Sequence, residues 1–131
     1  MEYKKAQVGV EFMIIMGALL LFVSIFLLII QGNTEDKRYQ REDILTKEVA
    51  LTVQNEINLA LKSGDGYIRE FKIPEKIGEL EYEISVDSGV VYIRTDDGRH
   101  ALTLPVIEIN GSINVTNNVI EKINGVVYLN R

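Results

Sequence analysis

The chain lacks most of the side chains that build reactive or metal-binding sites. Its 131 residues include no cysteine and a single histidine, His100. The missing thiols exclude disulfides, thiolate metal sites and cysteine nucleophiles. No serine stands in a pattern with a histidine and an acid, and no spacing of Asp and Glu matches a calcium-binding loop. We therefore expect a protein that is not an enzyme and that needs neither a cofactor nor a metal.

Positive charge is also scarce. The chain carries 14 Lys and Arg against 19 Asp and Glu, a formal net charge of −5. Nucleic-acid binders need clustered basic side chains to neutralise phosphates. Because this sequence has no basic cluster beyond its N-terminus, we exclude nucleic acid as a partner. The length fits one globular domain plus an anchor.

Charge is absent altogether from residues 12–30, a continuous apolar run. A helix needs roughly 20 apolar residues to cross a bilayer. Lys4 and Lys5 precede the run, and the positive-inside rule then keeps the N-terminus in the cytoplasm and everything after Ile30 outside the cell. Glu11 directly precedes this run, at the N-terminal end of the expected span. A carboxylate in the hydrocarbon costs about 2.5–3.5 kcal/mol on insertion scales, so this charge suggests a function beyond anchoring.

A short pattern surrounds that charge. Lys4, Lys5, Ala6 and Gln7 are followed by Glu11, four residues after Gln7, and then by the unbroken apolar run. This pattern resembles the class III signal peptide of archaeal type IV pilins. The resemblance implies that a prepilin peptidase cuts between Ala6 and Gln7, that Gln7 becomes the new N-terminus, and that Glu11 takes the place of the glutamate typical of the family.

The same resemblance implies a function and a layout. Residues 1–6 would be a cleaved leader, 7–32 a transmembrane helix that later lies in a filament core, and 33–131 an extracellular head. The protein would be a subunit of an adhesive surface pilus, a glycoprotein that waits in the cytoplasmic membrane before assembly. Its partners would be further copies of itself, other pilins and the prepilin peptidase. Ala6, Gly9 and Ile15 stand where the family often has Gly, Ser and Leu.

Two interpretations of Glu11 remain open. Its carboxylate could pair with the α-amine that cleavage exposes on Gln7, a pairing that neutralises both groups inside a helix bundle. It could instead sit at headgroup depth, where the positive end of the helix dipole favours an anion. The second interpretation fits an alternative function, an uncleaved single-pass membrane protein with a small external binding domain. Gly17, Ala18 and Ser24 would let neighbouring helices approach closely in either case.

Residues 35–62 are expected to form an amphipathic helix. Apolar side chains recur every four residues, a spacing that predicts one buried stripe: Leu45, Val49, Val53, Ile57 and Leu61, with Ala60 beside them. Gln31-Gly32-Asn33 precedes this helix, and it predicts a kink or a short melted joint, with an unbroken helix as the alternative. Residues 63–66, Ser-Gly-Asp-Gly, end the helix.

From Tyr67 onward the apolar period changes to two, which predicts strands. The expected strands are 67–73, 80–86, 90–94 and 100–104, followed by one or two more within 106–115 and 126–129. Tight turns between them indicate antiparallel pairing. We therefore predict an α+β fold in which the long hydrophobic and amphipathic N-terminal helix packs on a small antiparallel β-sheet head, 67–131.

Five polar residues of the head are candidate site residues. Asn110-Gly111-Ser112 and Asn114-Val115-Thr116 are N-glycosylation sequons, so Asn110 and Asn114 are candidate acceptors. Asp96 and Asp97 are adjacent carboxylates, which a hairpin turn explains. His100 lies in a predicted hairpin strand, where a lone histidine is far more often an ordinary strand residue than a catalytic base.

Overall fold

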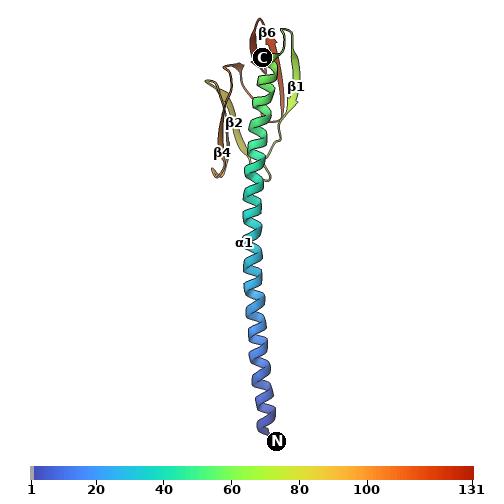
Figure 1. The fold of residues 1–131 in the computed structure, drawn as a ribbon, viewed down its shortest axis with the longest axis vertical. Helices are drawn as coiled ribbons and strands as arrows, with labels where there is room; N and C mark the ends of the chain where they lie inside the picture. Colours follow the sequence, from blue (N-terminus) through green and yellow to red (C-terminus); the bar gives the residue numbers. More distant parts are fainter. Residues whose placement is uncertain (1) are drawn as a thin grey trace. The chain divides into compact units, whose positions relative to one another are not determined.

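The fold is that of a computed structural model, which describes residues 2–131 and gives side chains from Gln7 onward. One helix, α1 (Glu2–Lys62), is followed by seven strands (Figure 1). The chain divides into two compact units, Met1–Tyr39 and Gln40–Arg131. The side chains of Lys4, Lys5 and Ala6, which the sequence assigns to the leader and cleavage site, lie outside the described residues.

Helix α1 runs without interruption through Gly32, so the expected kink is not observed and the unbroken alternative is the correct one. A glycine inside a helix costs about 1 kcal/mol relative to alanine. Once a helix is nucleated, each further residue adds a hydrogen bond, and one glycine does not outweigh the turns on both sides. Thr34 does not start a new helix, because its Oγ1 donates to the carbonyl of Ile30 at 2.9 Å within the same helix.

The last third of α1 supplies the core of the second unit. Val49, Val53, Ile57 and Ala60 are buried, as the four-residue stripe predicted. Leu61 is 36% exposed, contrary to that stripe. Each step of four residues overshoots a full turn by about 40° in a helix of 3.6 residues per turn. Over the stripe this drift turns Leu61 away from the core and brings Ala60 into its place.

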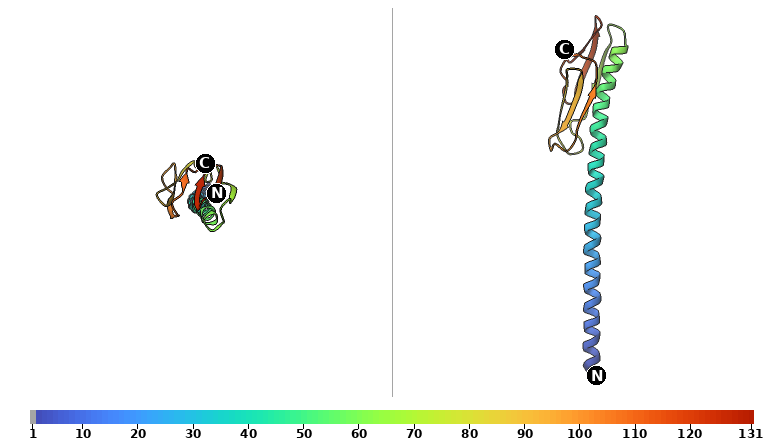
Figure 2. Two further views of the ribbon diagram at one scale, coloured as in Figure 1. Left: turned by 90° about the horizontal axis from the view of Figure 1, so that it is seen from above. Right: turned by 60° about the vertical axis from the view of Figure 1, so that its left-hand side comes forward.

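The strands form two sheets beside this part of α1 (Figures 1 and 2). The four-stranded sheet has the order β1-β6-β7-β5, with β1 (Ile68–Lys72), β6 (Asn117–Ile123), β7 (Val126–Leu129) and β5 (Asn110–Gly111). The three-stranded sheet has the order β2-β3-β4, with β2 (Tyr82–Asp87), β3 (Val90–Thr95) and β4 (Ala101–Pro105). The predicted α+β class is confirmed, but the strands make two sheets rather than one, and β5 pairs with β7 in parallel.

The inner faces of both sheets meet α1 in one hydrophobic core. Its strand residues are Phe71, Tyr82, Val91, Ile93, Ile120, Val127 and Leu129. The helix ends at Lys62, where the sequence predicted, and β6 caps its C-terminus. Lys122 Nζ donates to the carbonyls of Leu61 at 2.6 Å and Ser63 at 2.7 Å. This cation neutralises the negative end of the helix dipole and satisfies carbonyls that have no partner in the helix.

Candidate functional site

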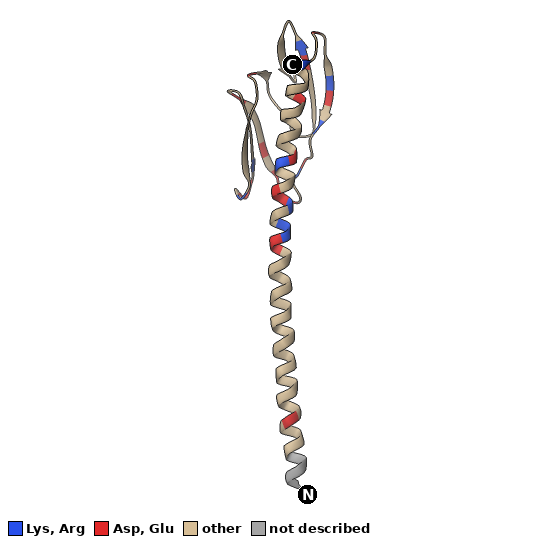
Figure 3. Cartoon of the chain, in the orientation of Figure 1, with Lys and Arg blue, Asp and Glu red and all other residues tan. Residues whose placement is uncertain are grey.

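The first unit presents a continuous apolar helix surface. Large side chains along it are mostly exposed, among them Met13 at 76%, Phe22 at 74% and Leu28 at 69%. Within the described residues, the helical stretch Gln7–Lys62 is the one helix long and apolar enough to cross a membrane, and none of its apolar window is buried. Figure 3 shows the long tan segment without Lys, Arg, Asp or Glu. Such a surface is stable only in lipid or against other apolar helices.

Gln7 and Glu11 lie one turn apart on this helix. Gln7 Nε2 donates a long hydrogen bond of 3.4 Å to Glu11 Oε1, and both side chains are exposed. A carboxylate accepts about four hydrogen bonds, so one weak amide contact leaves most of the acceptor capacity of Glu11 available. The two residues that the sequence singled out for assembly are therefore neighbours, with a carboxylate that a stronger donor could bind.

His100 is buried, with 2% of its surface exposed, and it joins the β3–β4 hairpin to α1. Its Nε2 lies 3.6 Å from Glu42 Oε2, and its Nδ1 lies 3.5 Å from Asp43 Oδ1. The backbone N–H of His100 donates to Thr95 Oγ1 at 3.2 Å. Both ring nitrogens thus face carboxylates of the helix. Sequence reasoning missed Glu42 and Asp43 as neighbours of this histidine, because no local spacing links α1 to the hairpin. In the described part of the chain, no group of three His, Asp or Glu side chains could hold a metal ion.

Asp96 and Asp97 form the turn that the sequence predicted, and the hydrogen bonds of their side chains stay within it. Thr95 Oγ1 donates to Asp97 Oδ1 at 2.7 Å, and the N–H of Arg99 donates to the same oxygen at 3.0 Å. These hydrogen bonds, the one from Thr95 first, lower the pKa of Asp97 below its ordinary value of 3.8. Gly98 follows with φ of 71°, the left-handed conformation that closes such hairpins.

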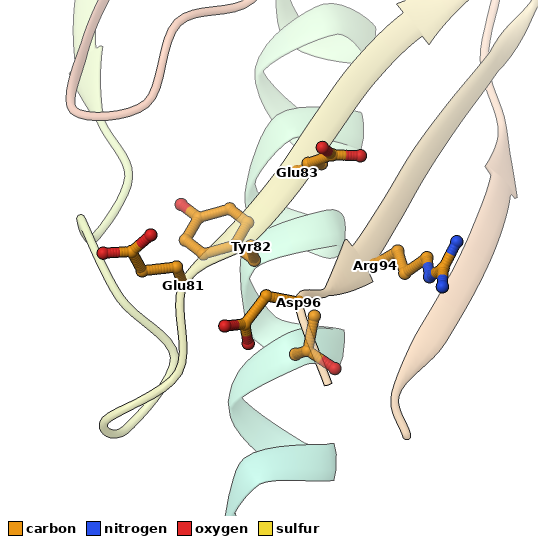
Figure 4. A pocket seen from close by; sticks show the side chains of 6 residues that line it. Glu81, Tyr82, Glu83, Arg94 and Asp96 are labelled. Atoms are coloured by element: carbon orange, nitrogen blue, oxygen red, sulfur yellow. The ribbon is translucent and has the colours of Figure 1, made fainter. Parts of the chain in front are cut away.

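A shallow cleft of about 330 Å³ lies beside this turn, over β2 and β3 (Figure 4). It is lined by Glu81, Tyr82, Glu83, Arg94, Thr95 and Asp96. In Figure 4, Glu81 and Asp96 extend to one side, whereas Arg94 extends to the other. The Tyr82 hydroxyl donates to the carbonyl of Pro74. The charged side chains of the cleft point in different directions. They therefore do not converge on one charged group of a ligand.

Tyr82 gives the head a predictable response to alkaline pH. Burial raises the pKa of Tyr82 from 10.0 to about 12, because the phenolate is disfavoured there. The folded state therefore holds this proton more tightly than the unfolded state does, and stability falls as pH rises between those two values. We expect Tyr82→Phe to remove this contribution to the loss of stability at alkaline pH. The measurement is urea unfolding at pH 8 to 12. Tyr92→Phe, at a side chain 38% exposed, is the control for removing a tyrosine hydroxyl at the surface of the same sheet.

The two sequons lie at different places in the head. Asn110 is exposed and belongs to β5, in register with Tyr128 of β7. Asn114 is also exposed, but its backbone is held by Asn118, which is 1% exposed. Asn118 Oδ1 accepts from the N–H of Asn114, and Asn118 Nδ2 donates to its carbonyl, both at 2.8 Å. Both acceptor side chains are thus at the surface, and their use for glycosylation stays a prediction.

No protein-family model matches the chain, and neither a curated protein nor a solved structure is similar enough to count as a match. The established features are therefore structural: an α+β fold with a long apolar helix at its N-terminus and a β-sheet head. This combination is compatible with a pilin or with a single-pass membrane protein, and the apolar helix indicates association with a membrane.

Proposed function

We propose that the protein is the structural subunit of an archaeal type IV pilus that serves in surface adhesion. In this proposal a prepilin peptidase removes residues 1–6, and the mature chain leaves the membrane to assemble through its N-terminal helix. The head, which contains the strands, then faces outward along the filament. The pilus itself would be a helical array of many copies of this chain, without a catalytic site.

The observation that supports this proposal best is the position of Glu11 on α1. The side chains around it from Gln7 onward are apolar or uncharged and exposed. Among these described side chains, the carboxylate contacts only Gln7, at 3.4 Å. An anchor does not need an acidic group near the start of its span, where insertion into the hydrocarbon costs free energy. In a helix bundle, however, the Glu11 carboxylate would be stabilising, because cleavage before Gln7 would place a positive α-amine one turn away.

The second candidate is an uncleaved single-pass membrane protein with a small external binding domain. The compact head, Gln40–Arg131, favours it, because such a unit can act on its own. Under this alternative Lys4 and Lys5 stay on the chain, and Glu11 sits at headgroup depth. The two candidates differ in the covalent state of the N-terminus, which is directly measurable.

Mass spectrometry of the protein isolated from its own cells tests the proposal. We expect a mature N-terminus at Gln7, because a free amine at that position is what the assembly step requires. A cyclised pyroglutamyl form would also report the cut, although cyclisation removes that amine. Replacing Ala6 with a bulky charged residue should block the cut and leave the precursor in the membrane. Met1 retained on most molecules in wild-type cells would refute the proposal and favour the anchored binding domain.

A further inference from the structure

The Gln7 carboxamide has few polar side chains near it on α1. Between Val8 and Ile30 the sequence contains two other polar side chains, Glu11 and Ser24. Ser24 lies more than four turns away, and its Oγ donates to the carbonyl of Leu20 at 2.8 Å. Among the described side chains of this segment, Glu11 is therefore the one acidic acceptor that the helix places beside Gln7.

The contact with Glu11 draws the Gln7 side chain away from its own backbone nitrogen. Gln7 Nε2 donates to Glu11 Oε1 at 3.4 Å. Residues four apart are neighbours on a helix surface, and Glu11 lies about 6 Å further toward the C-terminus. The backbone nitrogen of Gln7 lies on the opposite, N-terminal side of its Cα. A carboxamide that reaches Glu11 thus keeps its carbon, Cδ, turned away from that nitrogen.

The surroundings of this pair are apolar, which strengthens the contact. A hydrogen bond of 3.4 Å is weak in water. Val8, Val10 and Phe12, beside the pair, are 65%, 58% and 62% exposed, and such a surface is stable only in lipid or against other apolar helices. No water competes for the carboxylate there, and the low dielectric increases the attraction between donor and acceptor.

Cleavage before Gln7 would make this residue chemically reactive. Its backbone nitrogen would become a free α-amine, and the neutral amine can attack Cδ of the carboxamide in the same residue. A new C–N bond then closes a lactam ring, the Cδ–Nε2 bond breaks, and ammonia leaves with one proton from the amine. The reaction needs no co-reactant, and its product is a pyroglutamyl residue without a positive charge.

We propose that Glu11 is a positioning residue that prevents mature Gln7 from cyclising and so preserves the α-amine. This inference rests on the proposed function, because it requires cleavage before Gln7. The Glu11 carboxylate acts in two ways. It holds the carboxamide one turn away from the α-amine. When it pairs with the α-amine instead, that group is an ammonium, which has no lone pair with which to attack Cδ.

Protection of the α-amine would matter for assembly. A lactam N–H is neutral, so a cyclised chain would bring the Glu11 carboxylate into a helix bundle without a cation to pair with. An uncompensated buried charge of this kind is strongly destabilising. We therefore expect the cyclised fraction of Gln7 to be severalfold lower in filaments than in the membrane fraction of the same cells.

The test follows the loss of ammonia from Gln7 in the full chain. Wild-type and variant proteins are extracted in detergent from the membrane fraction and incubated at one pH, and mass spectrometry of the N-terminal peptide gives the cyclised fraction over time. Glu11→Leu should cyclise severalfold faster than the wild type. Glu11→Gln keeps an oxygen acceptor without the charge and should be intermediate, whereas Glu11→Asp should restore much of the protection. Ile15→Leu, one turn further along, is the control and should cyclise at the wild-type rate.

Two results would overturn the inference. One is an equal rate of cyclisation in the wild type and in Glu11→Leu. The other is a slower rate in Glu11→Leu, which would mean that the carboxylate removes a proton from the amine and promotes the attack. If Glu11→Leu is not cleaved, Glu11→Gln takes its place in the comparison. Failure of the proposed function is a different result, because Met1 would then remain on the chain and no variant would have Gln7 at its N-terminus.

Discussion

Glu11→Gln is expected to abolish filament assembly while membrane insertion and cleavage before Gln7 continue. The substitution removes a charge and keeps the size of the side chain. Hydrophobicity alone gives α1 little reason to leave the bilayer, because lipid tails are as apolar as leucine. A polar contact that forms only between docked, processed helices would therefore favour the filament over the membrane.

The expected size of the effect follows from the cost of an unpaired charge. Removing one partner of a buried ion pair costs about 3–5 kcal/mol. At 1.4 kcal/mol for each factor of ten, this lowers the assembly constant per subunit by roughly two to four orders of magnitude. In Glu11→Gln the α-amine on Gln7 would remain in the bundle without the carboxylate. We therefore expect this variant to impair filament assembly severely.

Electron microscopy of sheared filaments, together with immunoblots of the membrane fraction, checks this expectation. Glu11→Asp keeps the charge and should assemble at least in part, and Ile15→Leu on the same apolar helix should assemble as the wild type does. Normal filaments from Glu11→Gln would mean that the carboxylate only sits at headgroup depth. That outcome would favour the alternative function, an uncleaved single-pass membrane protein with a small external binding domain.

The sequence predicted the elements whose pattern is local and strong. The apolar run, the stop of α1 after Lys62 and the first four strands follow from periodicity and turn residues, and each lies within two residues of its expected position. β6 was missed because its inward set is Asn118, Ile120 and Lys122, in which two polar residues hide the alternation. The signal that could have found it is Asn124-Gly125, both with positive φ, which is typical of a tight hairpin turn.

Contacts between distant segments could not be predicted in the same way. His100 meets Glu42 and Asp43 only because the β3–β4 hairpin packs on α1, and nothing near His100 in the sequence indicates those partners. The position of Asn110 beside Tyr128 depends on β5 joining β7 in parallel, which requires a two-residue strand that carries no periodicity. Sheet register, rather than composition, determines both features.

Ile57→Ala should destabilise the head by about 2–4 kcal/mol, the range for truncating a fully buried aliphatic side chain. Ile57 is 0% exposed and belongs to the single core that joins α1 to both sheets. Small domains are stable by only about 5–15 kcal/mol in total, so this loss is a large fraction of the stability. The measurement is urea unfolding followed by circular dichroism, on a fragment that begins at Thr34 and therefore omits the apolar segment.

Leu59→Ala is the matched control, because Leu59 lies two residues away on the same helix and is 41% exposed. Leu59→Ala should lower the free energy of unfolding much less than Ile57→Ala does, because truncating Leu59 leaves no cavity in the core. The fragment itself is expected to be soluble, monomeric and of mixed α/β content, because unit Gln40–Arg131 keeps its whole core without the first unit. Equal losses for the two variants would contradict the core assignment. An unfolded or aggregated fragment would instead mean that the head is completed by its neighbours in a filament, so that its stability depends on assembly through α1.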